Sequence, residues 1–206
     1  SRARLQALYD QLPRIRVLDP ACGCGNFLVI AYRELRRLEM ALIERLFSKG
    51  GQSKGLLDIG TQSRVTVDQF YGLEIDPSAA HIAQVALWIT DHQLNLITAE
   101  RFGSTRPSIP LVKSAHIRQG NALRVDWAEV LAPEQCSFIV GNPPFVGAKY
   151  QSAEQREDVA AVLGGIANHG LLDYVACWHV LAARYMQANP QMACALVSTN
   201  SICQGE

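Results

Sequence analysis

The tetrapeptide Asn142-Pro143-Pro144-Phe145 carries the most specific chemistry in this sequence. Two consecutive prolines fix the backbone and remove two N–H donors. The acceptors that remain are the side-chain oxygen of Asn142 and the carbonyl of Pro143, and the ring of Phe145 follows at once. This set suits a planar substrate that carries an NH₂ group. Because acceptors on both amine hydrogens favour a pyramidal, nucleophilic nitrogen, we expect the segment to be catalytic.

A glycine-containing turn forms a second candidate site. It reads Asp19, Pro20, Ala21, Cys22, Gly23, Cys24, Gly25, Asn26 and Phe27. Two glycines one residue apart allow a sharp turn and a close approach to a ligand. The helix start that follows offers free N–H groups and a positive dipole end. The dinucleotide fingerprint G-x-G-x-x-G requires a third glycine where this chain has Leu28, so a nicotinamide dinucleotide is the disfavoured rival ligand.

Two shorter segments extend this set. Glu74 and Ile75 end an apolar run, and an acidic residue at a strand end can accept hydrogen bonds from both hydroxyls of a ribose. Glu74 follows Gly25 at more than the usual spacing of about twenty residues, and a polar insertion at Ser48–Gly60 explains the difference. Asn121-Ala122 follows a later strand and either reads the edge of an adenine or forms an ordinary turn.

The elements that must position these residues alternate between strand and helix. The predicted strands are Ile15–Asp19, Phe70–Ile75, Ile117–Gly120, Ser137–Val140 and Ala193–Ser198. Alternating strands and helices predict a parallel sheet covered on both faces. We expect the first strand at the centre, the second and third on one side, and the fourth and fifth on the other. The ligand site then lies beyond the carboxyl ends of the strands.

Three helices are predicted from apolar spacing. The expected buried faces are Phe27, Ala31, Leu35, Leu38 and Leu42 in the first helix and Ile82, Val85, Ala86 and Ile89 in the second. The third helix is expected near Leu171–Met186, with Asp173 at its start. The Arg33–Arg37 cluster is interpreted as a solvated helix face. Ser48–Gly60 and Phe102–Pro110 are expected to be surface loops.

Composition limits the class of protein. Hydrophobic residues make up 49% and charged residues 18% of 206 residues, which predicts one domain with a sizeable core. No stretch is long and apolar enough to cross a membrane, and no signal peptide opens the chain. The net charge is zero, which argues against strong DNA binding by this chain alone. Its six cysteines and five histidines lack metal-ligand spacing, so we expect no metal and a reducing cytoplasm.

The motif order resembles that of the amino-methylating DNA methyltransferases whose cofactor motif precedes the catalytic motif. The motifs are D-P-A-C-G-x-G-x-F-L, G-x-E-x-D, G-N-A-L and N-P-P-F. The chain looks most like the methylase part of MmeI-like single-chain restriction–modification enzymes, with support from 83–94, 142–147 and 199–206. The resemblance implies a three-layer Rossmann-like class I methyltransferase fold, S-adenosylmethionine as cofactor and N6 of adenine in double-stranded DNA as target, in a bacterial cytoplasm.

The resemblance also assigns roles. The loop Pro20–Phe27 holds the methionine part of the cofactor, and Asp19 just before it is a further cofactor-binding residue. Glu74 holds the ribose, and Ile75, Asn121 and Ala122 hold the adenine. Asn142–Phe145 holds the target base. Cys24 departs from the family pattern, which usually has Ser there, but both side chains are small.

Alternative functions remain at this point. Some RNA guanine and protein glutamine methyltransferases use the same N-P-P-(F/Y) loop for planar NH₂ groups. A cytosine carbon methyltransferase is disfavoured, because it needs a Cys nucleophile and none of the cysteines here follows a proline. A non-enzymatic assembly or DNA-contact module is the third alternative.

The resemblance finally implies that residues 1–206 are a partial catalytic domain. We expect the last two strands, an upstream cofactor-contacting segment and a target-recognition domain to lie outside them. The 206-residue chain alone is therefore expected neither to select a DNA sequence nor to turn over at an appreciable rate.

Overall fold

The computed structural model describes residues 1–47, 63–102 and 114–200. Its helices are α1 (Arg2–Gln11), α2 (Asn26–Phe47), α4 (Pro77–Phe102), α5 (Ala153–Leu163) and α6 (Ala176–Met186). Its strands are β1 (Val17–Asp19), β2 (Phe70–Glu74), β3 (His116–Gln119), β4 (Phe138–Gly141) and β5 (Ala193–Leu196). The predicted loop 48–60, residues 103–110 of the second predicted loop, and residues 201–206 lie outside the described residues.

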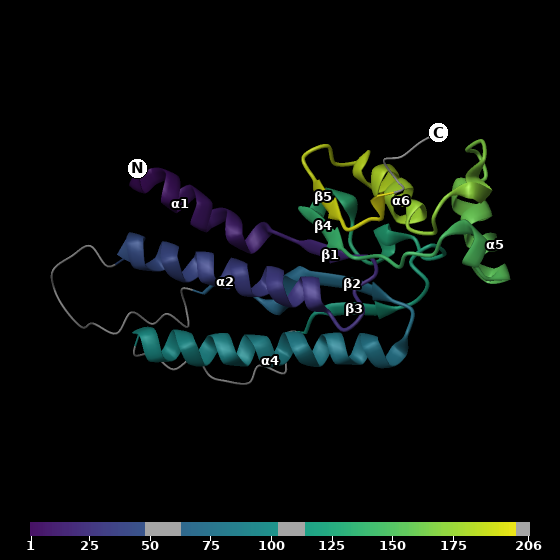
Figure 1. Ribbon diagram of the computed structural model, residues 1–206. Coiled ribbons are helices and arrows are strands. Elements are labelled where there is room, and N and C mark those ends of the chain that lie inside the picture. Colours follow the sequence, from purple (N-terminus) through teal and green to yellow (C-terminus); the bar gives the residue numbers. More distant parts are fainter. Residues whose placement is uncertain (48–62, 103–113, 201–206) are drawn as a thin grey trace.

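The five strands form one parallel sheet in the order β3-β2-β1-β4-β5. Val17 of β1 pairs with Phe70 of β2 on one side and with Phe138 of β4 on the other. This order confirms the predicted central first strand with two strands on each side. Because all five strands are parallel, the segments that follow β1, β2, β3 and β4 leave the sheet at the same edge (Figure 1).

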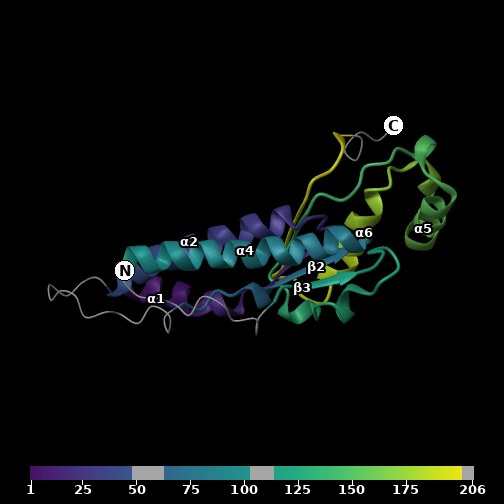
Figure 2. The same ribbon diagram turned by 90° about the horizontal axis from the view of Figure 1, so that it is seen from below.

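Helices cover both faces of the sheet. Successive residues of β1 point to opposite sides, as in any strand. Val17 packs into a core with residues of α1, α2 and α4, whereas Leu18 packs into a second core with residues of α5 and α6. The long helices α2 and α4 run side by side over the first face (Figures 1 and 2). The predicted three-layer, Rossmann-like fold is confirmed.

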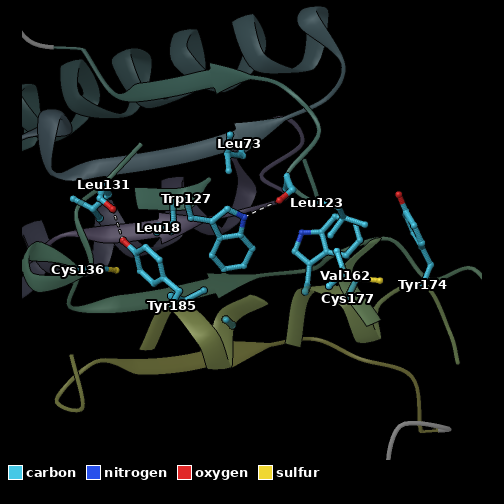
Figure 3. Packing of buried hydrophobic residues seen from close by; sticks show 14 of the residues in the cluster. Leu18, Leu73, Leu123, Trp127, Leu131, Cys136, Val162, Tyr174, Cys177 and Tyr185 are labelled. Carbon is cyan, nitrogen blue, oxygen red and sulfur yellow. Dashed lines mark hydrogen bonds between the residues drawn. The ribbon is translucent and has the colours of Figure 1, made fainter. Parts of the chain in front are cut away.

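The second core contains several aromatic residues whose polar ends are satisfied. Trp127 Nε1 donates to the carbonyl of Ala122 over 2.8 Å, and the Tyr185 hydroxyl of α6 donates to the carbonyl of Leu131 (Figure 3). Buried Trp and Tyr side chains usually require such partners. The Trp127 bond also fixes the turn after β3, where Asn121 and Ala122 lie.

The predicted buried faces of two helices are partly wrong. In α4, Ile82, Val85 and Ile89 are exposed, while Ala83, Leu87 and Leu94 are buried. The helix has apolar residues all round, so spacing alone selects the wrong side. The start of α4 lies so close to the glycine turn that a Cβ on Gly25 would be only 3.0 Å from Ala83 Cβ. A small residue therefore faces inward at this point. In α2 the prediction fails for Phe27 and Leu38, which are exposed, and the buried positions include Leu28, Tyr32 and Ile43.

The interpretation of Arg33–Arg37 as a solvated face is wrong for Arg36. Its side chain is 1% exposed, and its Nε lies 3.6 Å from Oε2 of Glu39, which is equally buried. Its Nη1 donates to the Val65 carbonyl and its Nη2 to Oδ1 of Asn95. Glu39 accepts the backbone N–H groups of Arg64 and Val65. The pair therefore connects α2, α4 and the chain that leads into β2.

Two elements near the sheet edge differ from the prediction. Helix α5 was not predicted, although Ser152 and Gln155 form a capping box at its start. Helix α6 begins at Ala176, so Leu171 lies outside it, in a short 3₁₀ turn. The side chain of Asp173 accepts the N–H of Val175 just before the helix starts.

Candidate active site

A cavity of about 530 Å³ lies at the carboxyl edge of the sheet. Sequence-predicted residues from all four motifs line it: Pro20, Ala21, Gly23, Glu74, Ile75, Asn121, Ala122, Asn142 and Pro144. A cavity of this size falls within the range of small-molecule sites. Further lining residues come mainly from α5 and α6 and their approaches: Leu73, Gly120, Ser152, Glu154, Gln155, Asp158, Tyr174 and Trp178.

The turn after β1 is held in a conformation that its glycines permit. Gly23 and Gly25 have φ angles of +53° and +86°, in the region that favours glycine. The Cys22 N–H donates to the Leu73 carbonyl, which joins the turn to β2. The indole N–H of Trp178 donates to the Pro20 carbonyl over 3.0 Å, which joins it to α6. The turn is thus anchored on both sides of the cavity.

Glu74 ends β2 with its carboxylate oriented by backbone groups. Its Oε2 accepts the N–H of Gly23 over 2.8 Å, and its Oε1 accepts the N–H of Asp76 over 2.9 Å. A carboxylate oxygen accepts about two hydrogen bonds. Each oxygen of Glu74 therefore retains acceptor capacity for a ligand in the cavity.

Asp19 ends β1 and is buried behind the turn. Its Oδ1 accepts the Ala21 N–H over 3.0 Å and would lie 2.5 Å from a Cβ at Gly141, so glycine is required there. Burial raises the pKa of Asp19 to about 7; the Ala21 N–H opposes this increase and the negative charge of Glu74 adds to it. Asp19 therefore packs the end of β1 against Gly141 at the end of β4 and does not line the cavity.

The side chain of Asn121 has partners within the protein. Its Oδ1 accepts the Leu123 N–H and its Nδ2 donates to Asp158 over 2.9 Å. Asp158 of α5 also accepts from Arg124 Nε and from the Tyr174 hydroxyl. Burial alone would raise the pKa of Asp158, but these three hydrogen bonds lower it below its ordinary value. Sequence analysis missed Asp158; the capping box at Ser152 was the available signal for its helix.

The segment Asn142–Phe145, predicted to be catalytic, follows β4 directly. Asn142 lines the cavity, and no hydrogen bond between described residues occupies its side-chain amide. Phe145 is 43% exposed and lies beyond the cavity lining. Behind it, Val146 donates its N–H to Asp173 and accepts the N–H of Tyr174. Asp173, expected from the sequence at the start of the third helix, thus positions the backbone of this segment.

The structure brings together nine of the sixteen predicted site residues in one cavity. The other seven lie in the same segments but outside the lining: Asp19, Cys22, Gly25, Asn26, Phe27, Pro143 and Phe145. Gly25 and Cys22 shape the turn, since the Gly25 N–H donates to the Cys22 carbonyl over 2.8 Å.

No group of three or more His, Cys, Asp or Glu side chains in residues 1–47, 63–102 and 114–200 is arranged to hold a metal ion. Within the same ranges, no helix combines the length and apolar character needed to cross a membrane.

Comparison with known proteins decides the family. The sequence model of the MmeI DNA-methyltransferase domain matches residues 1–206. The chain belongs to this family. The solved structure of the Type IIL restriction–modification enzyme MmeI in complex with DNA superposes on this MmeI-type domain with a TM-score of 0.94 and 48% identity. The match covers 100% of this chain and 27% of that one.

Two further proteins are similar to this chain, one in sequence and one in fold. DNA methyltransferase A of Bacillus subtilis (strain 168) is 40% identical over 98% of this chain and 23% of its own length. The ATP-dependent Type ISP restriction–modification enzyme LlaBIII, bound to DNA, is 16% identical with a TM-score of 0.52 over 85% of this chain and 12% of its own, and shares the fold. The MmeI-type domain thus spans about a quarter of the first two relatives.

Proposed function

We propose that this domain transfers a methyl group from S-adenosylmethionine to the exocyclic N6 amine of adenine in DNA. One observation carries the proposal: Gly23, Glu74 and Asn142, from three separate segments, line a single cavity of about 530 Å³. A nucleotide-like cofactor and an amine substrate can then meet within one cavity. The DNA complex of the relative MmeI supports DNA as the substrate.

The residues on one side of the cavity fit S-adenosylmethionine. The left-handed glycines of the turn bring backbone close to the ligand, and the oriented carboxylate of Glu74 can accept both ribose hydroxyls. Because the Asn121 amide is engaged by Leu123 and Asp158, the adenine is recognised by the backbone and shape of this turn together with Ile75. When bound, the cofactor supplies an electrophilic methyl group on a positively charged sulfur.

The residues on the other side act on the target amine. The exocyclic nitrogen of adenine is a weak nucleophile because its lone pair is delocalised into the ring. The Asn142 side-chain oxygen and the Pro143 carbonyl accept its two hydrogens and favour the pyramidal nitrogen of the transition state. Since this geometry exists mainly in the transition state, the two acceptors contribute to turnover more than to ground-state binding.

The target base must leave the duplex to reach Asn142. Methyltransferases that act on bases rotate the target nucleotide out of the stack and hold it by hydrogen bonds and stacking. Phe145 follows the two prolines and is partly exposed beside the cavity. Its ring is placed to stack on an extruded base, at a gain on the order of 1–3 kcal/mol.

Product analysis on the intact enzyme tests this proposal. Labelled S-adenosylmethionine is supplied with duplex DNA, RNA or protein, and the products are digested to nucleosides or amino acids. We expect label in N6-methyladenine from duplex DNA. Label in RNA guanine, protein glutamine or cytosine would overturn the proposed substrate. Failure to bind the cofactor in a calorimetric titration would instead favour a non-enzymatic module.

A further inference from the structure

Large apolar side chains on two segments near the proposed catalytic residues face solvent. Tyr150 is 86% exposed and Leu171 is 78% exposed, the two highest values among large hydrophobic residues in the described ranges. Phe145, Ile166 and Leu172 from the same two segments, 145–151 and 166–172, are also exposed. Single exposed apolar residues are ordinary, but such a group beside a proposed active site indicates contact with a partner.

The two segments are tied together by buried polar contacts. Gln151 is 5% exposed, and its Nε2 donates to the Val146 carbonyl over 3.2 Å and to the Leu172 carbonyl over 3.0 Å. Tyr150 directly precedes Gln151, and Leu171 directly precedes Leu172. Both exposed side chains therefore project from backbone that a buried amide holds in place. This placement distinguishes them from residues at a flexible loop tip.

The same bridge places them next to the proposed target-base site. Val146, which Gln151 and Tyr174 hold by its carbonyl, follows Phe145 directly. Extruding a base leaves a gap in the DNA stack and an unpaired partner base, and proteins that unstack DNA often insert apolar side chains between base steps. An aromatic ring can stack on a neighbouring base, and Leu171 adds aliphatic bulk. Lys149, exposed and adjacent, can meet a phosphate.

We propose that Tyr150 and Leu171 form a wedge that enters duplex DNA beside the target adenine and fills the gap that the extruded base leaves. This inference rests on the proposed function, since it requires a base-extruding reaction on a duplex. The wedge lowers the free-energy cost of extruding the target adenine and takes no part in cofactor binding.

The test compares substrates that need a wedge with substrates that do not. In the intact enzyme, Tyr150→Ala and Leu171→Ala are compared with wild type and with Tyr150→Phe, which keeps the ring. Single-turnover methylation is measured on a fully paired duplex and on a duplex whose target adenine faces an abasic site. An adenine without a pairing partner costs less to extrude. Fluorescence of 2-aminopurine at the target position reports extrusion independently.

We expect Tyr150→Ala to reduce methylation and extrusion on the paired duplex by at least about fivefold, the lower end of a base–aromatic stacking contribution. Tyr150→Phe should stay close to wild type, and the abasic-partner duplex should restore Tyr150→Ala. Cofactor affinity should be unchanged in every variant, which also shows that they fold. Wild-type rates for both alanine variants on the paired duplex, or equal losses on both duplexes, would overturn the wedge. Wild-type enzyme that methylates neither duplex would instead overturn the proposed function.

Discussion

Gly23 donates its backbone N–H to Oε2 of Glu74 over 2.8 Å across 51 residues of sequence. The bond joins the turn after β1 to the end of β2. Because Asp76 donates to the other oxygen of the same carboxylate, Glu74 is oriented before any ligand arrives. The proposed ribose and methionine sites are therefore parts of one hydrogen-bonded unit.

Replacing Glu74 should weaken cofactor binding. Glu74→Ala removes a charged acceptor for two hydroxyls, at a loss on the order of 1.5–3 kcal/mol for each charge-assisted bond. It also removes the partner of the Gly23 N–H, which loosens the turn. Calorimetric titration with S-adenosylmethionine measures the loss. Glu100→Ala, at an exposed position far along α4, is the matched control. Unchanged affinity in folded Glu74→Ala would exclude Glu74 from the site.

Asp19 should make the stability of the domain depend on pH. Burial raises its pKa to about 7, against about 3.9 in an unfolded chain. As pH rises from about 4 to 7, the unfolded state releases the proton and the folded state keeps it, so the free energy of unfolding falls. The fall amounts to about 4 kcal/mol at most, at 1.36 kcal/mol for each unit of pKa. Above pH 7 the Asp19 carboxyl is ionised in both the folded and the unfolded state, and the loss in the free energy of unfolding stays constant.

Asp19→Asn should remove this dependence, because the amide resembles the protonated acid and its oxygen can still accept the Ala21 N–H. Urea unfolding from pH 4 to 8 should give similar stabilities near pH 4 and a more stable variant at pH 8. In the difference between the free energies of unfolding of the two proteins, the contributions of other titrating groups cancel. A constant difference across the whole range would show that the Asp19 carboxyl is not the source.

The buried ion pair should matter more for stability than its exposed neighbours. Arg36→Met leaves Glu39 charged and buried without its partner, which typically costs about 3–5 kcal/mol. Arg37→Met, one position along the same helix, removes an exposed pair with Glu34 and should cost less than about 1 kcal/mol. Urea denaturation of both variants measures the contrast. Equal effects would mean that Arg36 does not stabilise the junction of α2, α4 and β2.

The sheet and most of the site could be predicted from sequence because their signals are local. Each motif directly follows a short apolar run, and parallel strands bring their carboxyl ends to one edge. Gly23, Glu74 and Asn142 therefore lie around one cavity, although they are far apart in the chain. The strand order followed from the same reasoning.

The failures of prediction depend on contacts between distant segments. Helix α4 is apolar on more than one side, so its packing against other segments, including the close approach of Gly25 to Ala83, decides that Ala83 and not Ile82 faces inward. Arg36 is buried because Glu39, Val65 and Asn95 converge on it. Asp158 enters the site through Asn121 and Tyr174. No periodicity in one helix reveals such partners.

The single-turnover methylation rate of Asn142→Ala, in the intact enzyme with saturating S-adenosylmethionine and duplex DNA, tests the central claim most directly. Asn142 is proposed to act on the adenine amine in the transition state, so the rate should fall by at least about 100-fold, as when an oxyanion-hole donor is removed. Cofactor affinity, measured on the same preparation, should stay within about twofold of wild type, since the lost interaction forms only in the transition state. A rate close to wild type, or a loss of rate that parallels an equal loss of cofactor affinity, would contradict the assignment of Asn142 and the shared cavity built around it.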